Sequence, residues 1–136
     1  IIVNTIGPDI IMENSLGPLS FIGRDFYKFV LPVEQAFPDN IYFLYYADNE
    51  PMTRIVEYKK LTRHSAPTTL LGMEVPSMKG RYYPLPFKKE ISRAERYFAE
   101  MPDEVFNIGR AGSYTYWVDI DDCIEQAMQM ADDLSS

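Results

Sequence analysis

The residues best suited to chemistry lie in residues 107–116, where two glycines flank an arginine. Gly109 and Gly112 would let the backbone come close to a bound group, and Arg110 would add a charged, planar hydrogen-bond donor. A helix is predicted to start soon afterwards, and its unpaired N–H groups favour an anion or a carbonyl oxygen. This pattern is typical of a nucleotide or flavin site. The alternative is a strand-to-helix connection in which the glycines only permit the turn.

Two further segments, and the end of the first one, carry side chains that suit an anionic ligand. An arginine gives bidentate, permanently charged contact to a phosphate, and tyrosine hydroxyls add neutral donors. The alternative for the arginine is an ion pair across two strands, and for the tyrosines it is packing at the edge of a sheet. The sequence leaves these alternatives open. The residues concerned are Arg54, the pair Tyr82 and Tyr83, and Tyr114 with Tyr116.

Composition excludes several classes of function. The 136 residues carry a net charge of −7, which argues against nucleic-acid binding because no basic stripe could neutralise a phosphate backbone. One cysteine, Cys123, excludes an internal disulfide, and one histidine, His64, leaves little basis for a metal site or a Ser-His-Asp site. No apolar run approaches the roughly 20 residues of a membrane span. We therefore expect one domain-sized unit, no metal and a cytoplasmic location.

The elements that must position these side chains predict an α+β fold. Consecutive strands joined by short turns favour a mainly antiparallel meander sheet, because a parallel pair needs a long crossover. One short helix follows, and a C-terminal helix comes after a strand and a glycine turn, with Asp119 as its N-cap. The predicted strands are residues 20–31, 41–46, 53–59 and 68–75, followed by an extended segment at 81–86, a helix at 92–100, a strand at 104–109 and the last helix from 120.

Both ends of the chain predict an exposed apolar surface. Residues 1–5 form an apolar strand of the kind found inside a parallel sheet, and no obvious partner strands follow. The last helix carries one apolar stripe. We therefore expect the chain to be a fragment of a longer protein, with an exposed patch that a homodimer could cover. The stripe consists of Ile120, Ile124, Ala127, Ala131 and Leu134.

Several motifs, taken in series, resemble UDP-galactopyranose mutase. They are residues 48–59, 81–84 and 109–116, in the order and spacing of that family, with support from residues 16–21 and 68–71. The family lies within a wider group of flavin-dependent, amine-oxidase-like proteins, whose N-terminal Gly-x-Gly-x-x-Gly unit is not in this sequence. The resemblance implies a C-terminal part of such a flavoprotein. Residues 1–5 and 104–136 would then lie at the edge of the FAD-binding domain, and residues 17–90 would form the substrate-side sheet.

The resemblance also implies roles for individual residues. Arg54 would lie near the substrate, a UDP-sugar, and Tyr83 and Tyr116 would bind its diphosphate, with Tyr82 beside them. The implied activity is a ring-contracting isomerisation that uses reduced FAD, in the synthesis of cell-surface polysaccharide such as lipopolysaccharide. The residues implied at the cofactor are Gly109, Arg110, Gly112, Tyr114, Asp119 and Ile120.

Two departures from the family pattern leave other functions open. Thr115 replaces a basic residue between the two tyrosines, and one extra residue precedes Asp119. Both changes fall at the implied diphosphate and flavin edge. One alternative is therefore an FAD-dependent amine oxidoreductase of polysaccharide synthesis with a different substrate. Another is a non-catalytic sheet that binds carbohydrate.

Overall fold

The computed structural model describes residues 1–135 and divides them into two compact units. The first combines Ile1–Ile22 with the chain from Arg81 onward, and the second is Gly23–Gly80. Among the described residues, no helix is long and apolar enough to cross a membrane.

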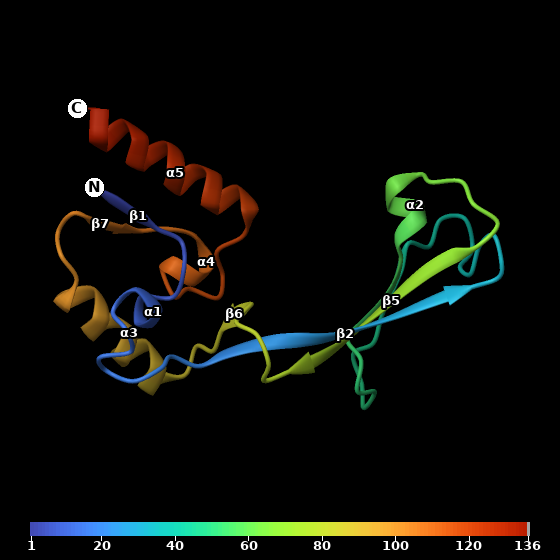
Figure 1. The fold of residues 1–136 in the computed structure, drawn as a ribbon, viewed down its shortest axis with the longest axis horizontal. Coiled ribbons are helices and arrows are strands. Elements are labelled where there is room, and N and C mark those ends of the chain that lie inside the picture. The colour runs from blue at the N-terminus through green and yellow to red at the C-terminus, as the bar shows by residue number, and fades with distance from the viewer. Residues whose placement is uncertain (136) are drawn as a thin grey trace. The chain divides into compact units, whose positions relative to one another are not determined.

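The first unit is built around a short parallel strand pair (Figure 1). β1 (Ile2–Asn4) pairs in parallel with β7 (Val105–Asn107), a partner strand that the sequence pattern did not make obvious. In addition, β6 (Tyr83–Pro84) pairs with the first two residues of β2 (Phe21–Leu31). The helices of this unit are α1 (Pro8–Ile11), α3 (Lys88–Glu100), α4 (Gly109–Gly112) and α5 (Ile120–Ser135).

The core of the first unit surrounds a tyrosine on α3. The side chain of Tyr97 is fully buried, and its hydroxyl accepts the N–H of Leu16 at 2.9 Å and donates to the carbonyl of Gly17 at 2.8 Å. A buried tyrosine needs such partners for its polar end. These bonds attach the loop after α1 to α3. The buried cluster consists of Leu19, Phe21, Ala94, Tyr97 and Tyr114.

The second unit is an antiparallel sheet. β3 (Phe43–Tyr45), β4 (Arg54–Glu57) and β5 (Thr69–Ser77) form a meander, and β2 lies on the other side of β5. The strand order of the whole five-stranded sheet is β3-β4-β5-β2-β6. The predicted α+β class with a mainly antiparallel sheet is confirmed. The sequence did not predict that β2 pairs with β5. In a simple meander, β2 would lie beside β3.

A buried glutamate ends β4 earlier than predicted. The chain turns after Glu57 into α2 (Tyr58–Thr62), although the sequence predicted strand up to residue 59. The Glu57 carboxylate accepts the N–H groups of Ala36 and Phe37, both at 2.9 Å, and the hydroxyl of Thr69 at 2.6 Å. These partners lie far away in sequence, so strand periodicity could not reveal the turn.

The apolar stripe of α5 is exposed, as predicted. Ile120 is 82% exposed, and Ile124, Met128 and Leu134 are also exposed. A neighbouring face of α5, which carries Cys123, Gln126 and Met130, is the partly buried one. The stripe read from the sequence therefore faces solvent in the described chain. At the start of the chain, Ile1, Ile2 and Val3 are also exposed.

Candidate functional site

Aromatic rings and one arginine gather where β6, α4 and the segment before α5 meet. The guanidinium carbon of Arg110 lies 4.8 Å from the centroid of the Tyr83 ring, within the range of a cation–π contact. The rings of Tyr83 and Tyr116 have centroids 5.9 Å apart, and Tyr116 meets Trp117 edge to face at 4.8 Å. The structure thus brings together Tyr83, Arg110 and Tyr116, three of the residues that the sequence singled out. We call these three residues with Trp117 the aromatic–arginine cluster.

Two bonds to the segment before α5 hold the Arg110 side chain in place. Its Nε donates to the carbonyl of Val118 at 2.8 Å, and a terminal nitrogen donates to Oδ1 of Asp119 at 2.5 Å. The Asp119 side chain is 75% exposed, so water screens this ion pair and an incoming anion could compete for the guanidinium. Arg110 is therefore oriented but not sealed inside the protein.

Asp119 lies at the N-cap position directly before α5 (Ile120–Ser135), as predicted. Its carbonyl accepts the N–H of Cys123 at 3.0 Å, which is the first bond of the helix. The carboxylate of Asp122 accepts the N–H of Asp119 at 2.8 Å, so the third residue of the helix reaches back to its start. The carboxylate of Asp119 itself contacts Arg110. One residue thus connects the helix start to the aromatic–arginine cluster.

The two glycines serve the packing of the chain itself. Gly109 has a φ of +72°, and its N–H donates to the side chain of Gln126 on α5 at 2.7 Å. A Cβ on Gly112 would lie only 2.5 Å from the carbonyl oxygen of Asn4 in β1. These contacts agree with the reading in which the glycines permit the connection. Contact of either glycine with a cofactor stays a prediction.

Tyr114 lies in the core rather than at the surface. Its hydroxyl donates to the carbonyl of Ser20 at 2.7 Å and lies 3.2 Å from that of Leu85, and its ring meets Phe21 edge to face. Burial, aided by the negative charge of Glu90, raises the pKa of Tyr114 to about 12. The hydroxyl is thus neutral and bonded within the protein. Contact between Tyr114 and a cofactor stays a prediction.

Three other predicted residues are not members of this cluster. Tyr82 and Ile120 are exposed. Arg54 belongs to the second unit, where its Nε donates to Glu74 at 2.6 Å. That bond is the cross-strand ion pair which the sequence left open as an alternative. Whether Arg54 also contacts a substrate stays a prediction.

The sequence pattern did not indicate Trp117 as a site residue. It is the single tryptophan of the chain, and it is 77% exposed beside Tyr116. A large ring left in water next to other rings is a common feature of binding surfaces. The available signal was its place directly after Tyr116, within the stretch that departs from the family pattern.

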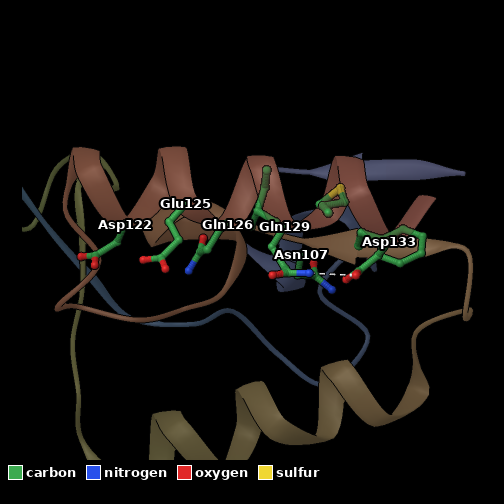
Figure 2. Close-up of a pocket in the computed structure, with 9 residues that line it drawn as sticks. Asn107, Asp122, Glu125, Gln126, Gln129 and Asp133 are labelled. Carbon is green, nitrogen blue, oxygen red and sulfur yellow. Dashed lines mark hydrogen bonds between the residues drawn. The ribbon is translucent and has the colours of Figure 1, made fainter. Parts of the chain in front are cut away.

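The partly buried face of α5 borders a separate groove (Figure 2). This groove lies between α5 and β7 and has a volume of about 520 Å³. Phe106, Ile108 and Met130 contribute apolar surface, while its polar rim carries carboxylates and amides, with Gln129 donating to Asp133 at 2.9 Å. An acidic rim disfavours an anionic ligand. In the described chain, no group of side chains is arranged to hold a metal ion.

Fold and site together define an α+β protein with an exposed cluster suited to a planar or anionic ligand such as a nucleotide. The family model of UDP-galactopyranose mutase matches residues 1–116, so the chain belongs to this family. That family depends on FAD and acts on UDP-sugars. The match ends at Tyr116 and leaves Trp117 and α5 outside. The comparison with curated proteins gave no match.

The residues present fit only one edge of a flavin. The exposed ring of Trp117 meets Tyr116, and the exposed Ile120 follows Asp119, which contacts Arg110; flat and apolar surface near an arginine suits a planar ring with polar edges. The chain has no Gly-x-Gly-x-x-Gly motif for the dinucleotide phosphates.

Proposed function

We propose that this chain supplies the diphosphate-binding side chains and the flavin-edge surface of a nucleotide-sugar mutase. The overall reaction would be the interconversion of UDP-galactopyranose and UDP-galactofuranose, in the synthesis of cell-surface polysaccharide. The observation that carries the proposal is the aromatic–arginine cluster, whose tyrosines and arginine lie within the region matched by the family model. The remaining domain would hold the rest of the cofactor.

The cluster suits a diphosphate for electrostatic reasons. Arg110 presents a planar fork of N–H donors, and the hydroxyls of Tyr83 and Tyr116 add neutral donors without further positive charge. The exposed contact between Arg110 and Asp119 can give way to a phosphate, because a solvent-screened ion pair is weak. Stacking on Tyr83 keeps the guanidinium plane in place during this exchange. The cluster would thus bind and orient the leaving diphosphate.

Reduced FAD would supply the covalent chemistry at the anomeric carbon when bound. The residues of this chain would position the sugar diphosphate and exclude water from one side of the site. Trp117 and Ile120 would cover the flavin edge, and Asp119 would hold the start of α5 against Arg110. In this proposal no side chain of the chain acts as a nucleophile.

The test uses the whole protein that contains this chain. Its absorbance spectrum should show bound flavin, and after dithionite reduction it should convert UDP-galactofuranose to the pyranose. Tyr116→Phe should raise the KM for the UDP-sugar and leave flavin content unchanged. A protein without flavin, or one whose reduced form is inactive on this substrate, would refute the proposal.

A second candidate is an FAD-dependent amine oxidoreductase of polysaccharide synthesis. The observation that favours it is the end of the family match at Tyr116, directly before the exposed Trp117. Thr115, in place of a basic residue, further changes the charge at this edge. Net formation of peroxide or of a reduced acceptor in step with consumption of an amine would favour this candidate over the mutase.

A further inference from the structure

The groove between α5 and β7 lies beside a strand edge that has no partner strand among the described residues. β7 pairs only with β1, in a two-stranded parallel sheet. The carbonyl of Glu104 accepts the N–H of Ile2 at 2.8 Å, and the N–H of Ile108 donates to the carbonyl of Asn4 at 3.0 Å. Because a strand bonds a given neighbour through alternate residues, the backbone groups of residues 104, 106 and 108 face β1.

The backbone groups of Val105 and Asn107 therefore face the other edge of β7. The N–H of Val105 donates to the carbonyl of Pro102 at 3.0 Å. The carbonyl of Val105 and both backbone groups of Asn107 have no strand to pair with in the described part of the chain. Unpaired groups of this kind bind an added strand unless a proline, a charged side chain or a bulge blocks them. β7 reads Val-Phe-Asn and contains neither a proline nor a charge.

The groove beside this free edge combines apolar surface with negative charge. Its volume is about 520 Å³, and Phe106 and Met130 contribute apolar surface to it. α5, which borders the groove, carries five acidic residues and no basic one. Such a groove favours an occupant with apolar side chains and positive charge. The carboxylates that line it are those of Asp122, Glu125 and Asp133 (Figure 2).

The length of this acidic rim fits a short extended segment. Asp122 and Asp133 are about eleven residues apart on α5, which corresponds to about 16 Å at the rise of a helix. An extended chain covers the same distance in about five residues. A segment with a basic residue near each end, and apolar residues on the same face between them, would therefore match both the rim and the apolar surface of the groove.

We propose that the groove between α5 and β7 binds an extended segment of a partner polypeptide, which adds to β7 as a further strand and places basic side chains at the acidic rim. Main-chain bonds to Val105 and Asn107 would supply affinity, and alternate side chains in the groove would supply specificity. A second copy that paired through its own β7 would bring two acidic rims together, which charge repulsion disfavours. The proposal does not depend on the proposed function, because it uses no residue of the aromatic–arginine cluster.

The first test measures whether a matching peptide binds and whether its charge matters. The probe is rhodamine-labelled Lys-Thr-Val-Thr-Val-Thr-Lys, whose lysines and valines all lie on one face of an extended strand. Fluorescence anisotropy with the full 136-residue chain should show saturable binding. Replacing both lysines by glutamates should weaken binding about tenfold or more. No binding of the lysine peptide, or equal binding of the glutamate peptide, would overturn the proposal.

Methylation of the peptide amides separates strand addition from attraction between charges. Only alternate N–H groups of an added strand face β7. The two peptides to compare carry N-methyl groups either on both valines or on the threonines directly before them. One of these peptides should bind about tenfold more weakly than the unmethylated probe, and the other should differ from it by less than about threefold. Equal binding by the two methylated peptides would refute strand addition.

Two matched variants test the contact with α5. Glu125→Lys reverses a charge that lines the groove, whereas Asp132→Lys makes the same change on the same helix outside the lining. Glu125→Lys should weaken binding of the lysine peptide about tenfold, and Asp132→Lys should weaken it less than about threefold. Both side chains are exposed, so both variants should melt like the wild type. Equal effects on binding would rule out the groove as the site.

Amide hydrogen exchange, measured by NMR, identifies the strand that the peptide meets. The lysine peptide should slow exchange of the Asn107 N–H, which faces the free edge. The N–H of Ile108 is already bonded to Asn4 and should change little. Unchanged exchange at Asn107 would overturn strand addition. Slow exchange at Asn107 without peptide, in a chain that sediments as a dimer, would identify a second copy as the occupant and would also overturn the proposal.

Discussion

Arg110 stacks on Tyr83, with its guanidinium carbon 4.8 Å from the ring centroid, although the two residues are far apart in sequence. The contact joins α4 to β6 and so connects the glycine turn to the tyrosine pair. The same guanidinium donates to Val118 and Asp119, which precede α5. The orientation of Arg110 therefore depends on three segments at once, and the predictions for the proposed substrate site depend on this orientation.

Arg110→Lys should raise the KM for the UDP-sugar about tenfold in the whole protein, because lysine keeps the charge but loses the planar fork and most of the stacking on Tyr83. Steady-state kinetics with the reduced enzyme measures this. Arg96→Lys on the exposed side of α3 is the matched control and should leave KM unchanged. Equal KM values for both variants would remove Arg110 from the substrate site.

Trp117 should report ligand binding by its fluorescence, because it is the only tryptophan and is 77% exposed beside Tyr116. We expect emission typical of a solvated indole, with quenching when UDP or FMN is added. Tyr116→Phe keeps the ring contact and should preserve the starting spectrum while weakening the response to UDP. Trp117 fluorescence that does not change when UDP or FMN is added would argue against a binding role for this cluster.

Glu57 should make the second unit sensitive to acid. Burial would raise its pKa, but bonds from Thr69, Ala36 and Phe37, together with the charge of Lys60, lower the pKa from the usual 4.5 to about 2. A folded-state pKa below the unfolded value stabilises the protein above about pH 5, and this stabilisation is lost as the pH falls toward 2. The full contribution at neutral pH is about 3 kcal/mol.

Glu57→Gln should therefore be strongly destabilised at pH 7. Between about pH 6 and about pH 3, the range in which Glu57 would begin to take up its proton, the melting temperature of this variant should fall less than that of the wild type. Circular dichroism melts measure both effects. Glu34→Gln, an exposed carboxyl of the same unit, is the control and should follow the wild type. Parallel curves for the wild type and Glu57→Gln would contradict the assignment.

Gly112→Ala should destabilise the first unit by about 1–3 kcal/mol, because the new Cβ would lie 2.5 Å from the carbonyl oxygen of Asn4 and overpack the contact with β1. Urea unfolding of the chain measures the free energy of unfolding. Gly112→Ser should cost at least as much, since its side chain is larger. A change within about 0.3 kcal/mol in both variants would show that β1 can move away freely.

Ile124→Gln on the exposed stripe of α5 should leave the melting temperature of the chain nearly unchanged and reduce its self-association, because this side chain faces solvent. Met130→Gln on the partly buried face should lower the melting temperature. Analytical ultracentrifugation reports the predicted homodimer. If the wild type is monomeric at all concentrations tested, the homodimer prediction is wrong.

The sequence by itself determined the local elements and the residue types at the site. Alternating side chains and turn residues predicted β2, β5 and the meander, and a 3.6-residue period predicted α5 with its exposed stripe. The spacing of motifs indicated the family and pointed to Tyr83, Arg110 and Tyr116. These features are local, because periodicity and turn chemistry depend on neighbours along the chain.

Only the tertiary structure decided which of these residues meet and which serve the core. It placed Tyr114 on the carbonyls of Ser20 and Leu85, joined Arg54 to Glu74, and ended β4 at Glu57. Each decision depends on a partner that is distant along the chain, and a buried polar group requires such a partner to offset the cost of leaving water. Local sequence pattern contains no record of these partners, so their identity emerges only when the chain has folded.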